Sequence, residues 1–588
     1  MARIRITPLN KYEKQGQSKI VNSYGAVGTL IQTINNGSLI IDNFDKWPYY
    51  RDHLRQIRTG PEGLINNPAF IKEDRLLKRL KIELQCNSLT GIFKMPENKS
   101  DNRNGVLEEN KVISAHFFPM WFYCPKCGNM NYYVNNPEHK QFPFCCKLPK
   151  EQFSFVLVSE NGSIADIPWA KFLNADLADE QIQFEIADTK DINLVLKYST
   201  GGSAEHMETK KITATINGQT ITKSLATLPA KTFIEANGNE YKMAIRQGNN
   251  LCFVKTLASL YIPKYEIPDF EISLMNGAIG VLEEMGAPPT PEGLLNVVKG
   301  KFKNTNTNTD HIKFWLNEQQ NSATAETGED ELQVTEEEYK FKEFDFIVNH
   351  ESDYIEAYED ISFKKFECNK IGIQNLYRIN KLKVTQVQTG YTRLKPEGDL
   401  QKIYSEPNIL FYPGIEMKGE GMLMEMNTNQ LNAFLNNPNN NAQITDLEAL
   451  VHSLSHSIMK ELEFECGYPL NSLKERLYFG KEQINGVDQV KYAGVLIYSA
   501  SGAESSFGGI AALFETFNNK LKIITLIKNA CERAQDCPND PICIDENTNG
   551  NKGVCYSCNL IPETSCENFN QSLNRKQLIA FYQQYGTN

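Results

Sequence analysis

The sequence lacks any long apolar run, and this absence excludes proteins that cross a membrane with helices. No stretch approaches the ~18 apolar residues that a membrane-spanning helix requires. Residues 1–20 carry positive charge but no apolar segment behind it, so no secretory signal is predicted. We therefore expect a cytoplasmic protein. In that reducing compartment its fourteen cysteines would stay thiols or bind metal rather than form disulfides.

The sequence also lacks a loop for binding nucleotide phosphates. Residues 23–28 read Ser-Tyr-Gly-Ala-Val-Gly, but a phosphate-binding loop needs Lys and then Ser or Thr after its last glycine, and Thr-Leu follows here. Without this Walker A loop the chain has no route to ATP hydrolysis of the kind that helicase motors use. No other catalytic constellation is recognised in the sequence, so we expect that the protein is not an enzyme.

The net charge of −11 arises mainly from one acidic segment. Residues 326–360 hold fourteen acidic side chains against two lysines. A basic tract follows at 364–395, with eight basic residues against one acidic residue: Lys364, Lys365, Lys370, Arg378, Lys381, Lys383, Arg393 and Lys395. Such a tract is suited to follow the phosphate backbone of DNA. The alternative is that it pairs with the acidic segment beside it in sequence.

Six cysteines lie in the last sixty residues, and four of them are spaced to share one tetrahedral metal ion. Cys555 and Cys558 form a Cys-x-x-Cys knuckle that supplies half of a Zn²⁺ ligand shell. Cys537 and Cys543, separated by a loop with two prolines, supply the other half. Two spare thiols remain: Cys531 and Cys566. Several of these could be ordinary buried thiols, but their density favours a structural zinc site.

A second group of cysteines lies nearer the N-terminus. Cys124-Pro-Lys-Cys127 is a knuckle of the kind that opens a zinc ribbon, and seventeen residues separate Cys127 from Cys145. The second pair, Cys145 and Cys146, has no spacer, and adjacent cysteines chelate one tetrahedral ion less readily. All four could bind zinc, one of the pair could bind together with His139, or the ribbon could persist without metal as a packed hairpin.

Apolar periodicity predicts a mixed α+β, multidomain fold with β-rich N-terminal and middle regions and a C-terminal α/β domain. Leu76, Leu80 and Leu84 recur every four residues, which predicts an amphipathic basic helix over 72–84. Five consecutive regions are expected: 1–152 with the zinc-ribbon-like knuckle, 153–300 as a β-rich middle domain, 301–340 as an acidic and polar linker or insertion, 341–425 as a second strand-rich region with the basic tract, and 426–588 as the C-terminal domain with the cysteine cluster.

A strong helix is predicted at the start of the C-terminal domain. Thr445 or Asp446 can cap it, and apolar residues then recur at helical spacing. His452 and His456 lie one turn apart, but a metalloprotease motif needs Glu after the first His, and Ser453 occupies that position. We interpret the histidines as packing and hydrogen-bonding residues rather than ligands.

A strand followed by a glycine-marked helix start is predicted further along this domain. The segment KYAGVLIYSASG reads as the strand, and SSFGGIAALF reads as the start of the helix. The helix amides could bind an anion. Alternatively, the segment is a plain strand-to-helix connection.

These segments together resemble a known family. HSLSHSIMKELEFECGYPLNSLKERLYFG, SFGGIAALF, ACERAQDCPNDPIC and GVCYSCNLIPETSCENFNQSLNRKQLI resemble the C-terminal domain of unknown function that DrmB of bacterial DISARM antiphage systems shares with a group of DNA-repair helicases. SKIVNSYGAVGTLI, MWFYCPKCG and MAIRQGNNLCFVKTLASLYIP resemble the N-terminal and middle parts of DrmB. The resemblance covers most of the chain apart from 276–340.

The resemblance implies an accessory subunit rather than a motor. In DISARM systems DrmB accompanies the helicase DrmA, and the pair engages invading DNA near a single-stranded end. The expected partners are therefore an SF2-type, DrmA-like helicase and DNA with a single-stranded portion, without a membrane, and the expected cofactor is zinc.

Two other functions stay open. One is a stand-alone zinc hydrolase or nuclease built on the histidine pair and nearby carboxylates: His452, His456, Glu461, Glu463 and Glu465. It would need an open metal site with a general base in reach. The other is an assembly scaffold that does not contact nucleic acid.

Overall fold

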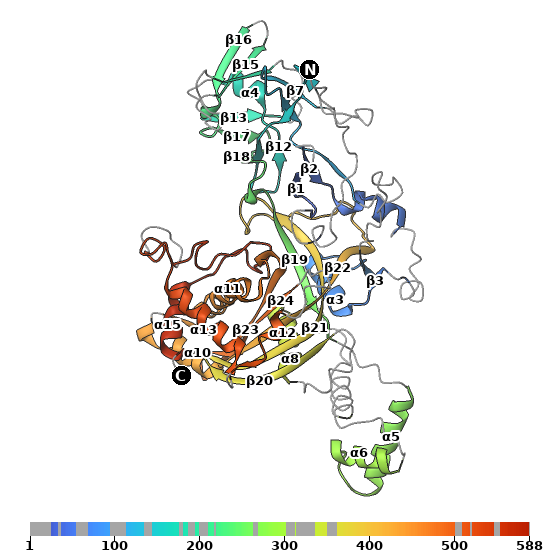
Figure 1. The fold of residues 1–588 in the computed structure, drawn as a ribbon. Helices are drawn as coiled ribbons and strands as arrows, with labels where there is room; N and C mark the ends of the chain where they lie inside the picture. The colour runs from blue at the N-terminus through green and yellow to red at the C-terminus, as the bar shows by residue number, and fades with distance from the viewer. Residues whose placement is uncertain are drawn as a thin grey trace, which may run out of the picture. The chain divides into compact units, whose positions relative to one another are not determined.

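A computed structural model of the protein describes most of the chain (Figure 1). The described residues are 21, 25–32, 37–53, 67, 69–94, 113–133, 144–175, 180–185, 194–198, 210–216, 219–262, 269–301, 312, 335–349, 361–440, 442–499, 509–517, 520–545 and 553–586. Most of the predicted linker at 301–340 lies outside them. Within the described ranges, no helix combines the length and apolar character needed to cross a membrane.

The chain forms two compact units, and each is built from discontinuous segments. Unit 1 comprises Met1–Ser259 and Val384–Met417, and unit 2 comprises Leu260–Lys383 and Lys418–Asn588. Both units combine helices with β-sheets, which confirms the predicted mixed α+β class. The units differ from the five consecutive regions of the sequence analysis because strands far apart in sequence pair with one another.

Unit 1 contains several small sheets. Their strand orders are β1-β2-β5, β10-β6-β7-β14-β15-β16 and β12-β11-β18-β17-β13, with a separate β8-β9 hairpin. The strands are β1 (Leu30–Gln32), β2 (Ser38–Ile41), β3 (Phe70–Ile71), β4 (Gly91–Lys94), β5 (Ala115–Phe117), β6 (Trp121–Tyr123), β7 (Asn129–Tyr132), β8 (Phe144–Cys145), β9 (Leu148–Pro149), β10 (Glu151–Gln152), β11 (Phe155–Val158), β12 (Ile164–Ala165), β13 (Gln181–Phe184), β14 (Leu194–Tyr198), β15 (Lys210–Ile216), β16 (Gln219–Ser224), β17 (Thr232–Glu235), β18 (Glu240–Ile245) and β19 (Phe253–Leu260).

The described residues of unit 1 contain few helices. They are α3 (Asp74–Leu84), α4 (Trp169–Asn174) and the short turns η1 (Phe44–Lys46), η2 (Tyr49–His53), η7 (Leu225–Thr227) and η8 (Asn249–Leu251). In α3 the side chains of Leu76, Leu80 and Leu84 are buried in an apolar core, which confirms the helix predicted from their spacing.

Unit 2 is built on long antiparallel strands. β24 (Val487–Ser499) pairs with β23 (Leu473–Ile484) and with β22 (Phe411–Met426), and β20 (Ser362–Lys370) pairs with β21 (Ile373–Thr392). Its other elements within the described ranges are α5 (Asp269–Glu284), α6 (Pro291–Gly300), α8 (Glu336–Asn349), α10 (Thr428–Leu435), η10 (Pro438–Asn440), η11 (Ile444–Asp446), α11 (Leu447–Cys466), η12 (Leu470–Ser472), α12 (Gly509–Ala512), β25 (Thr516–Phe517), β26 (Lys520–Leu521), α13 (Lys522–Gln535) and α15 (Arg575–Tyr585).

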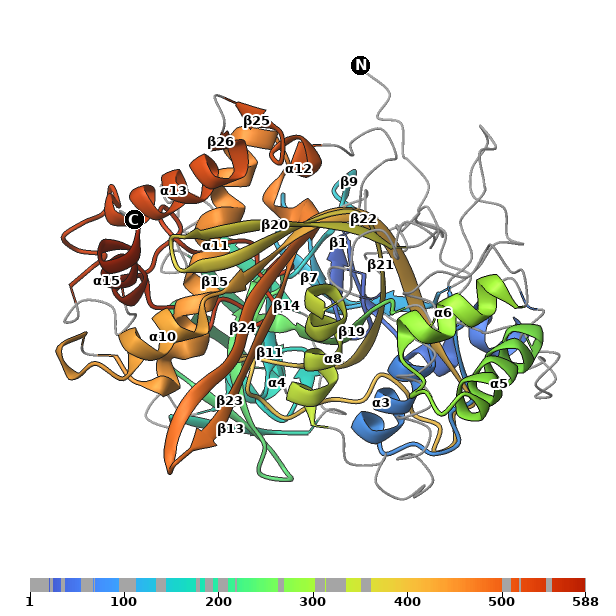
Figure 2. The same cartoon turned by 90° about the horizontal axis from the view of Figure 1, so that it is seen from below.

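Helix α11 forms the centre of unit 2, where a strong helix was predicted. Asp446 precedes it, and Gly467 ends it in the left-handed conformation, with φ of 69°. Helices α13 and α15 lie beside α11, and β23 and β24 pack against it (Figures 1 and 2). Fourteen of its twenty residues are buried. Polar side chains on this helix therefore need partners inside the protein.

Candidate metal centres

The predicted C-terminal ligands lie on two loops between α13 and α15. Cys537 and Cys543 belong to the first loop, and Cys555 and Cys558 to the second. All four Sγ atoms lie within 4.8 Å of one another, and three separations are 3.5 Å (Cys537 to Cys555), 3.7 Å (Cys555 to Cys558) and 3.8 Å (Cys543 to Cys558). Thiolates around one tetrahedral Zn²⁺ at ~2.3 Å are about 3.8 Å apart. This C-terminal cysteine cluster could therefore hold one metal ion.

Two basic side chains from outside the cluster hold its loops. Arg575, the first residue of α15, is fully buried. It donates hydrogen bonds to the carbonyl oxygens of Ala534 and Gly553 and to the carboxylate of Asp540. Lys460 of α11 donates to the carbonyl oxygens of Tyr556 and Leu560. Neither residue was predicted from the sequence, because a single basic residue carries no local pattern that marks a distant partner.

The thiols of this cluster differ in acidity. Burial raises the pKa of Cys555, but N–H groups of the Asn539 side chain and the Cys558 backbone outweigh burial and lower this pKa to about 6. Burial raises the pKa of Cys558 to about 11 and also raises that of Cys543. Without metal, the cluster would thus hold thiolate and protonated thiols together at neutral pH. Binding of a metal ion would release the remaining protons.

The two spare cysteines lie elsewhere. Cys531 is on α13 in the apolar core of unit 2, and burial raises its pKa to about 12. Cys566 lies 3.2 Å from His452 Nε2 rather than with the four clustered cysteines. Sequence spacing alone did not show that Cys531 lies in the core and Cys566 beside a histidine, because spacing does not show which way a side chain points.

The N-terminal knuckle forms a tight turn between β6 and β7. The Gly128 N–H donates to the Cys124 carbonyl oxygen at 2.8 Å, and the Cys124 N–H donates to the Asn129 carbonyl oxygen at 2.9 Å. Gly128 has φ of 74°, and a Cβ atom there would lie 1.7 Å from the Leu196 carbonyl oxygen. Only glycine fits this position.

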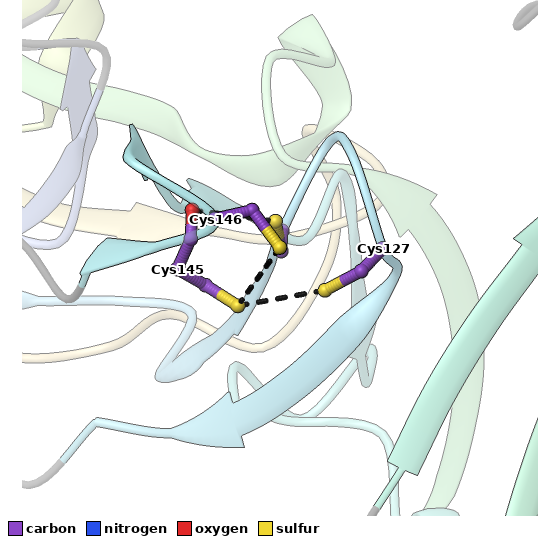
Figure 3. Close-up of side chains that lie close together, drawn as sticks. Cys127, Cys145 and Cys146 are labelled. Atoms are coloured by element: carbon purple, nitrogen blue, oxygen red, sulfur yellow. Dashed lines mark hydrogen bonds between the residues drawn. The ribbon is translucent and has the colours of Figure 1, made fainter.

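The adjacent cysteines lie at a two-residue hairpin turn that directs both toward the knuckle (Figure 3). Cys145 pairs with Leu148 across β8 and β9, so Cys146 and Lys147 form the turn. Both have positive φ, 51° and 66°, as two-residue hairpin turns of type I′ require. Because the chain reverses here, Cys145 Sγ lies 3.4 Å from Cys127 Sγ and 3.8 Å from Cys146 Sγ.

These contacts bring four thiols together in the N-terminal cysteine cluster: Cys124, Cys127, Cys145 and Cys146. Their Sγ atoms lie within 4.8 Å of one another, so the missing spacer does not prevent them from sharing an ion. A hydrogen bond from the Asn129 backbone lowers the pKa of Cys127 to about 7, whereas the neighbouring Cys127 raises the pKa of Cys145 to about 12. His139, the alternative ligand, lies outside the described residues.

Most of the basic tract lies on the β20–β21 hairpin. Its exposed members are Lys364, Lys365, Lys370, Lys381 and Lys395, and its half-buried members are Arg378 and Lys383. Lys364 lies opposite Arg378 in the strand register, and Lys365 lies opposite Tyr377. Successive residues of a strand point to opposite faces of a sheet. The tract is therefore divided between two faces and does not form one basic stripe.

Arg393 does not fit the predicted set of DNA contacts. Its side chain is only 1% exposed, and its three guanidinium nitrogens donate to the carbonyl oxygens of Gly162, Leu251 and Gly28. With all three nitrogens bonded inside the protein, this guanidinium does not reach a DNA phosphate. The expectation was wrong for this residue because folding surrounds it with carbonyl groups from three distant segments of unit 1.

In the described part of the acidic segment, 335–349, two ion pairs join helix α8 to residues outside the basic tract. Glu343 of α8 is buried and pairs with Arg476 of β23 at 2.5 Å. Lys340 of the same helix pairs with Glu567 at 2.8 Å. These pairs fasten α8 inside unit 2.

His452 and His456 are fully buried on α11 and face a carboxylate that was not predicted, Glu475 of β23. Their Nε2 atoms lie 3.1 and 3.2 Å from Glu475 Oε1. The three carboxylates suggested for a hydrolase take other positions: Glu463 and Glu465 are exposed, and Glu461 pairs with Arg533 at 2.7 Å. No sequence signal connected Glu475 with the histidines, because the contact depends on packing of β23 against α11.

The glycine-marked helix start binds a carboxylate of the protein itself. The backbone N–H groups of Ile510 and Ala511 in α12 donate to Glu420 at 3.1 and 3.3 Å. The Tyr468 hydroxyl donates to the same carboxylate. The helix amides therefore bind an anion, as one reading of the sequence allowed, and this anion is a carboxylate of the same chain.

The sequence is similar to a family model and to a curated protein, each over part of its length. Residues 16–241 match the family model described as a domain of unknown function (DUF8724). The chain is also 28% identical over 239 residues to the DISARM protein DrmB of Bacillus paralicheniformis, which covers 35% of this chain and 40% of that protein. The matched part thus spans well under half of the curated relative. The resemblance to DrmB that the motifs indicated is confirmed over this stretch.

Proposed function

We propose that this protein is a non-catalytic, DNA-binding accessory subunit that partners an SF2-type, DrmA-like helicase in bacterial antiphage defence. The observation that carries the proposal is the similarity to the DISARM protein DrmB over 239 residues. The sequence agrees with such a role, because it has no Walker A loop and a motor would be supplied by another chain.

Zinc is the ion that we assign to the two cysteine clusters. Four cysteine ligands are typical of structural zinc sites, and both clusters have sulfur separations near those of a tetrahedral shell. Four protein ligands leave no open position for a reactive water. The ion, when bound, would contribute folding free energy to the loops.

The loops of the C-terminal cysteine cluster present two exposed apolar side chains that suit a protein partner. Ile542, next to Cys543, is 64% exposed, and Tyr556, next to Cys555, is 72% exposed. Since the cysteines converge, Ile542 and Tyr556 lie on neighbouring loops and form one small platform. Exposed apolar and aromatic residues held on a rigid element are common anchors of protein interfaces. We assign this platform to contact with the helicase.

The test of the partnership is co-purification of the full chain with a DrmA-like helicase. We expect a stable complex from wild-type protein, and loss of the complex from the Ile542→Asp/Tyr556→Asp double variant with its zinc content unchanged. Phe517→Asp is the matched control, because Phe517 is 67% exposed but lies on β25. Failure of the wild-type protein to bind the helicase would overturn the partnership.

The test of DNA binding is fluorescence anisotropy with single-stranded, duplex and forked DNA over a range of salt concentrations. We expect affinity that falls steeply with salt, because basic side chains would displace counterions from phosphates. Binding to the helicase without any binding to DNA would instead favour the scaffold. Metal-dependent cleavage of the DNA by the isolated protein would favour the hydrolase.

A further inference from the structure

Four side chains with metal-binding atoms meet inside unit 2, away from both cysteine clusters: His452 and His456 of α11, Glu475 of β23, and Cys566 of the loop before α15. Their ligand atoms lie within 4.8 Å of one another. Each residue is at most 8% exposed. We call this set the His-Glu-Cys site.

The separations match the ligand shell of a small metal ion. His452 Nε2 lies 3.1 Å from Glu475 Oε1 and 3.2 Å from Cys566 Sγ, and His456 Nε2 lies 3.2 Å from the same Oε1. Nitrogen, oxygen and sulfur ligands at the usual zinc distances are about 3.3–3.7 Å apart around a tetrahedral ion. A small adjustment of the four side chains around an ion would account for the difference.

The hydrogen bonds of His456 leave its Nε2 atom to face Glu475. Its Nδ1 lies 2.8 Å from the carbonyl oxygen of Asn559, which only accepts, so Nδ1 must carry the proton. In a neutral ring Nε2 is then an acceptor that faces a carboxylate oxygen. Two acceptors at 3.2 Å repel one another, so either a second proton on the ring or a metal ion must lie between them. Metal-binding histidines commonly donate their other N–H to a carbonyl oxygen in this way.

The sulfur of Cys566 lies where two backbone amides would stabilise it as a metal-bound thiolate. Its Sγ accepts hydrogen bonds from the backbone N–H groups of Asn568 at 3.3 Å and Asn570 at 3.0 Å. Phe569 and Asn570 have positive φ, 51° and 60°, and this turn directs the amides at the sulfur. Backbone amides that converge in such a turn create a concave site for an anion.

Both carboxylate oxygens of Glu475 also accept hydrogen bonds from the protein. Its Oε2 accepts from the Ser455 hydroxyl at 2.5 Å, and its Oε1 accepts from the Glu567 backbone N–H at 3.1 Å. A carboxylate and a thiolate would bring two negative charges into an interior without exposed surface, and burying charges without compensation costs several kcal/mol each. A divalent cation would balance both charges and use the two histidine lone pairs.

We propose that the His-Glu-Cys site binds a divalent transition-metal ion, for which zinc suits the mixed nitrogen, oxygen and sulfur donors best. The ion joins α11, β23 and the loop before α15 from the inside of unit 2. Its four protein ligands close the shell, so its role is structural. This site is additional to the two cysteine clusters and does not depend on the proposed DNA and helicase partners.

The test is the zinc content of the full-length purified protein, measured by mass spectrometry per mole of chain. We expect Cys566→Ala to lose one zinc equivalent relative to the wild type. Cys531→Ala is the matched control, because Cys531 is a buried cysteine of the same unit outside the site, and it should lose none. Equal zinc content in soluble Cys566→Ala and wild-type protein would overturn the proposal.

A second measurement uses the unaltered protein and decides the question even if the variant does not fold. Crystals diffracted on both sides of the zinc absorption edge should show an anomalous peak between the two histidines, Glu475 and Cys566. A map with peaks at the cysteine clusters and none at this site would sink the proposal. Neither measurement involves DNA or the helicase. A negative result would therefore rule out the metal site without bearing on the proposed function.

Discussion

Arg575 and Asp540 form an ion pair with 2.7 Å between Nη2 and Oδ1. Asp540 lies on the loop between Cys537 and Cys543, so the pair connects the first residue of α15 to the C-terminal cysteine cluster. Arg575 is fully buried, and its other two bonds reach Ala534, before the first cysteine loop, and Gly553, before the second. One side chain thus holds both cysteine loops in place.

Replacement of Arg575 by Gln should therefore destabilise the cysteine loops. The change removes three hydrogen bonds and leaves Asp540 without this partner, at a cost of about 3 kcal/mol. The measurement is the urea midpoint of unfolding, together with the rate of zinc release to a coloured chelator. Lys528→Gln is the control, because its pair with Glu532 is exposed and should change stability by less than about 0.5 kcal/mol. If Arg575→Gln released zinc at the wild-type rate, Arg575 would not hold the cysteine loops in place.

Loss of a cysteine ligand should have a larger effect. Cys555→Ser and Cys558→Ser should each remove one zinc per chain, loosen the last part of unit 2 and abolish association with the helicase, because metal binding is coupled to folding. Zinc analysis, hydrogen exchange of residues 553–586 and co-purification measure these three effects. Soluble variants that keep the helicase would show that the cluster does not support docking.

Gly128→Ala should disrupt the N-terminal cysteine cluster. The added methyl group would overlap the Leu196 carbonyl oxygen, and the positive φ would add about 1 kcal/mol or more of strain. We expect the variant to lose the zinc of this cluster while keeping that of the C-terminal one. Gly280→Ala in α5 is the control, since a Cβ there would meet nothing within 4 Å. Unchanged metal content in Gly128→Ala would argue against a zinc ion at the knuckle.

Removal of exposed charges from the basic tract should weaken binding to DNA. The triple variant Lys364→Gln, Lys365→Gln and Lys381→Gln should flatten the dependence of log affinity on log salt by roughly one unit for each phosphate that a lysine no longer neutralises. Lys299, Lys301 and Lys528 are exposed outside the tract, and their replacement by Gln removes the same charge as a control. An identical salt slope in both triple variants would exclude a specific role of the tract. Arg393→Gln should instead destabilise unit 1, because its side chain is buried.

The stability of unit 1 should depend on pH through Asp166. Burial raises the pKa of this carboxyl from 3.8 to about 7, although backbone N–H groups of Met120 and Trp121 oppose the rise. The folded state therefore holds a proton that the unfolded state has released between these two values, so stability falls as pH rises through this window. Between about pH 5 and pH 8 the loss should be about 2 kcal/mol, or less where solvent reaches the side chain.

The measurement for Asp166 is the urea midpoint, followed by tryptophan fluorescence, at several pH values. In Asp166→Asn the dependence over this range should become shallower, because the amide does not titrate but still accepts the Met120 N–H. The same slope in both proteins would show that another group is responsible.

Features that depend on neighbouring residues were predictable from the sequence. The leucines of α3 recur with the helical period, and their burial followed from that spacing. The Cys-x-x-Cys knuckles place two thiols on one turn, so half of each cysteine cluster followed from local spacing. The mixed α+β class followed from the same kind of periodicity.

Features that depend on distant segments were decided only by the tertiary structure. The sequence marked Arg393 as an exposed basic residue and the histidine pair as a packing feature, and it did not mark Arg575 or Glu475. Folding surrounds Arg393 with carbonyl oxygens, and it places Glu475 against both histidines and Cys566. A sequence determines which groups are available for binding, whereas packing decides which of them are buried together. Once water is excluded, each buried polar group must find its partner among the groups that the fold brings close.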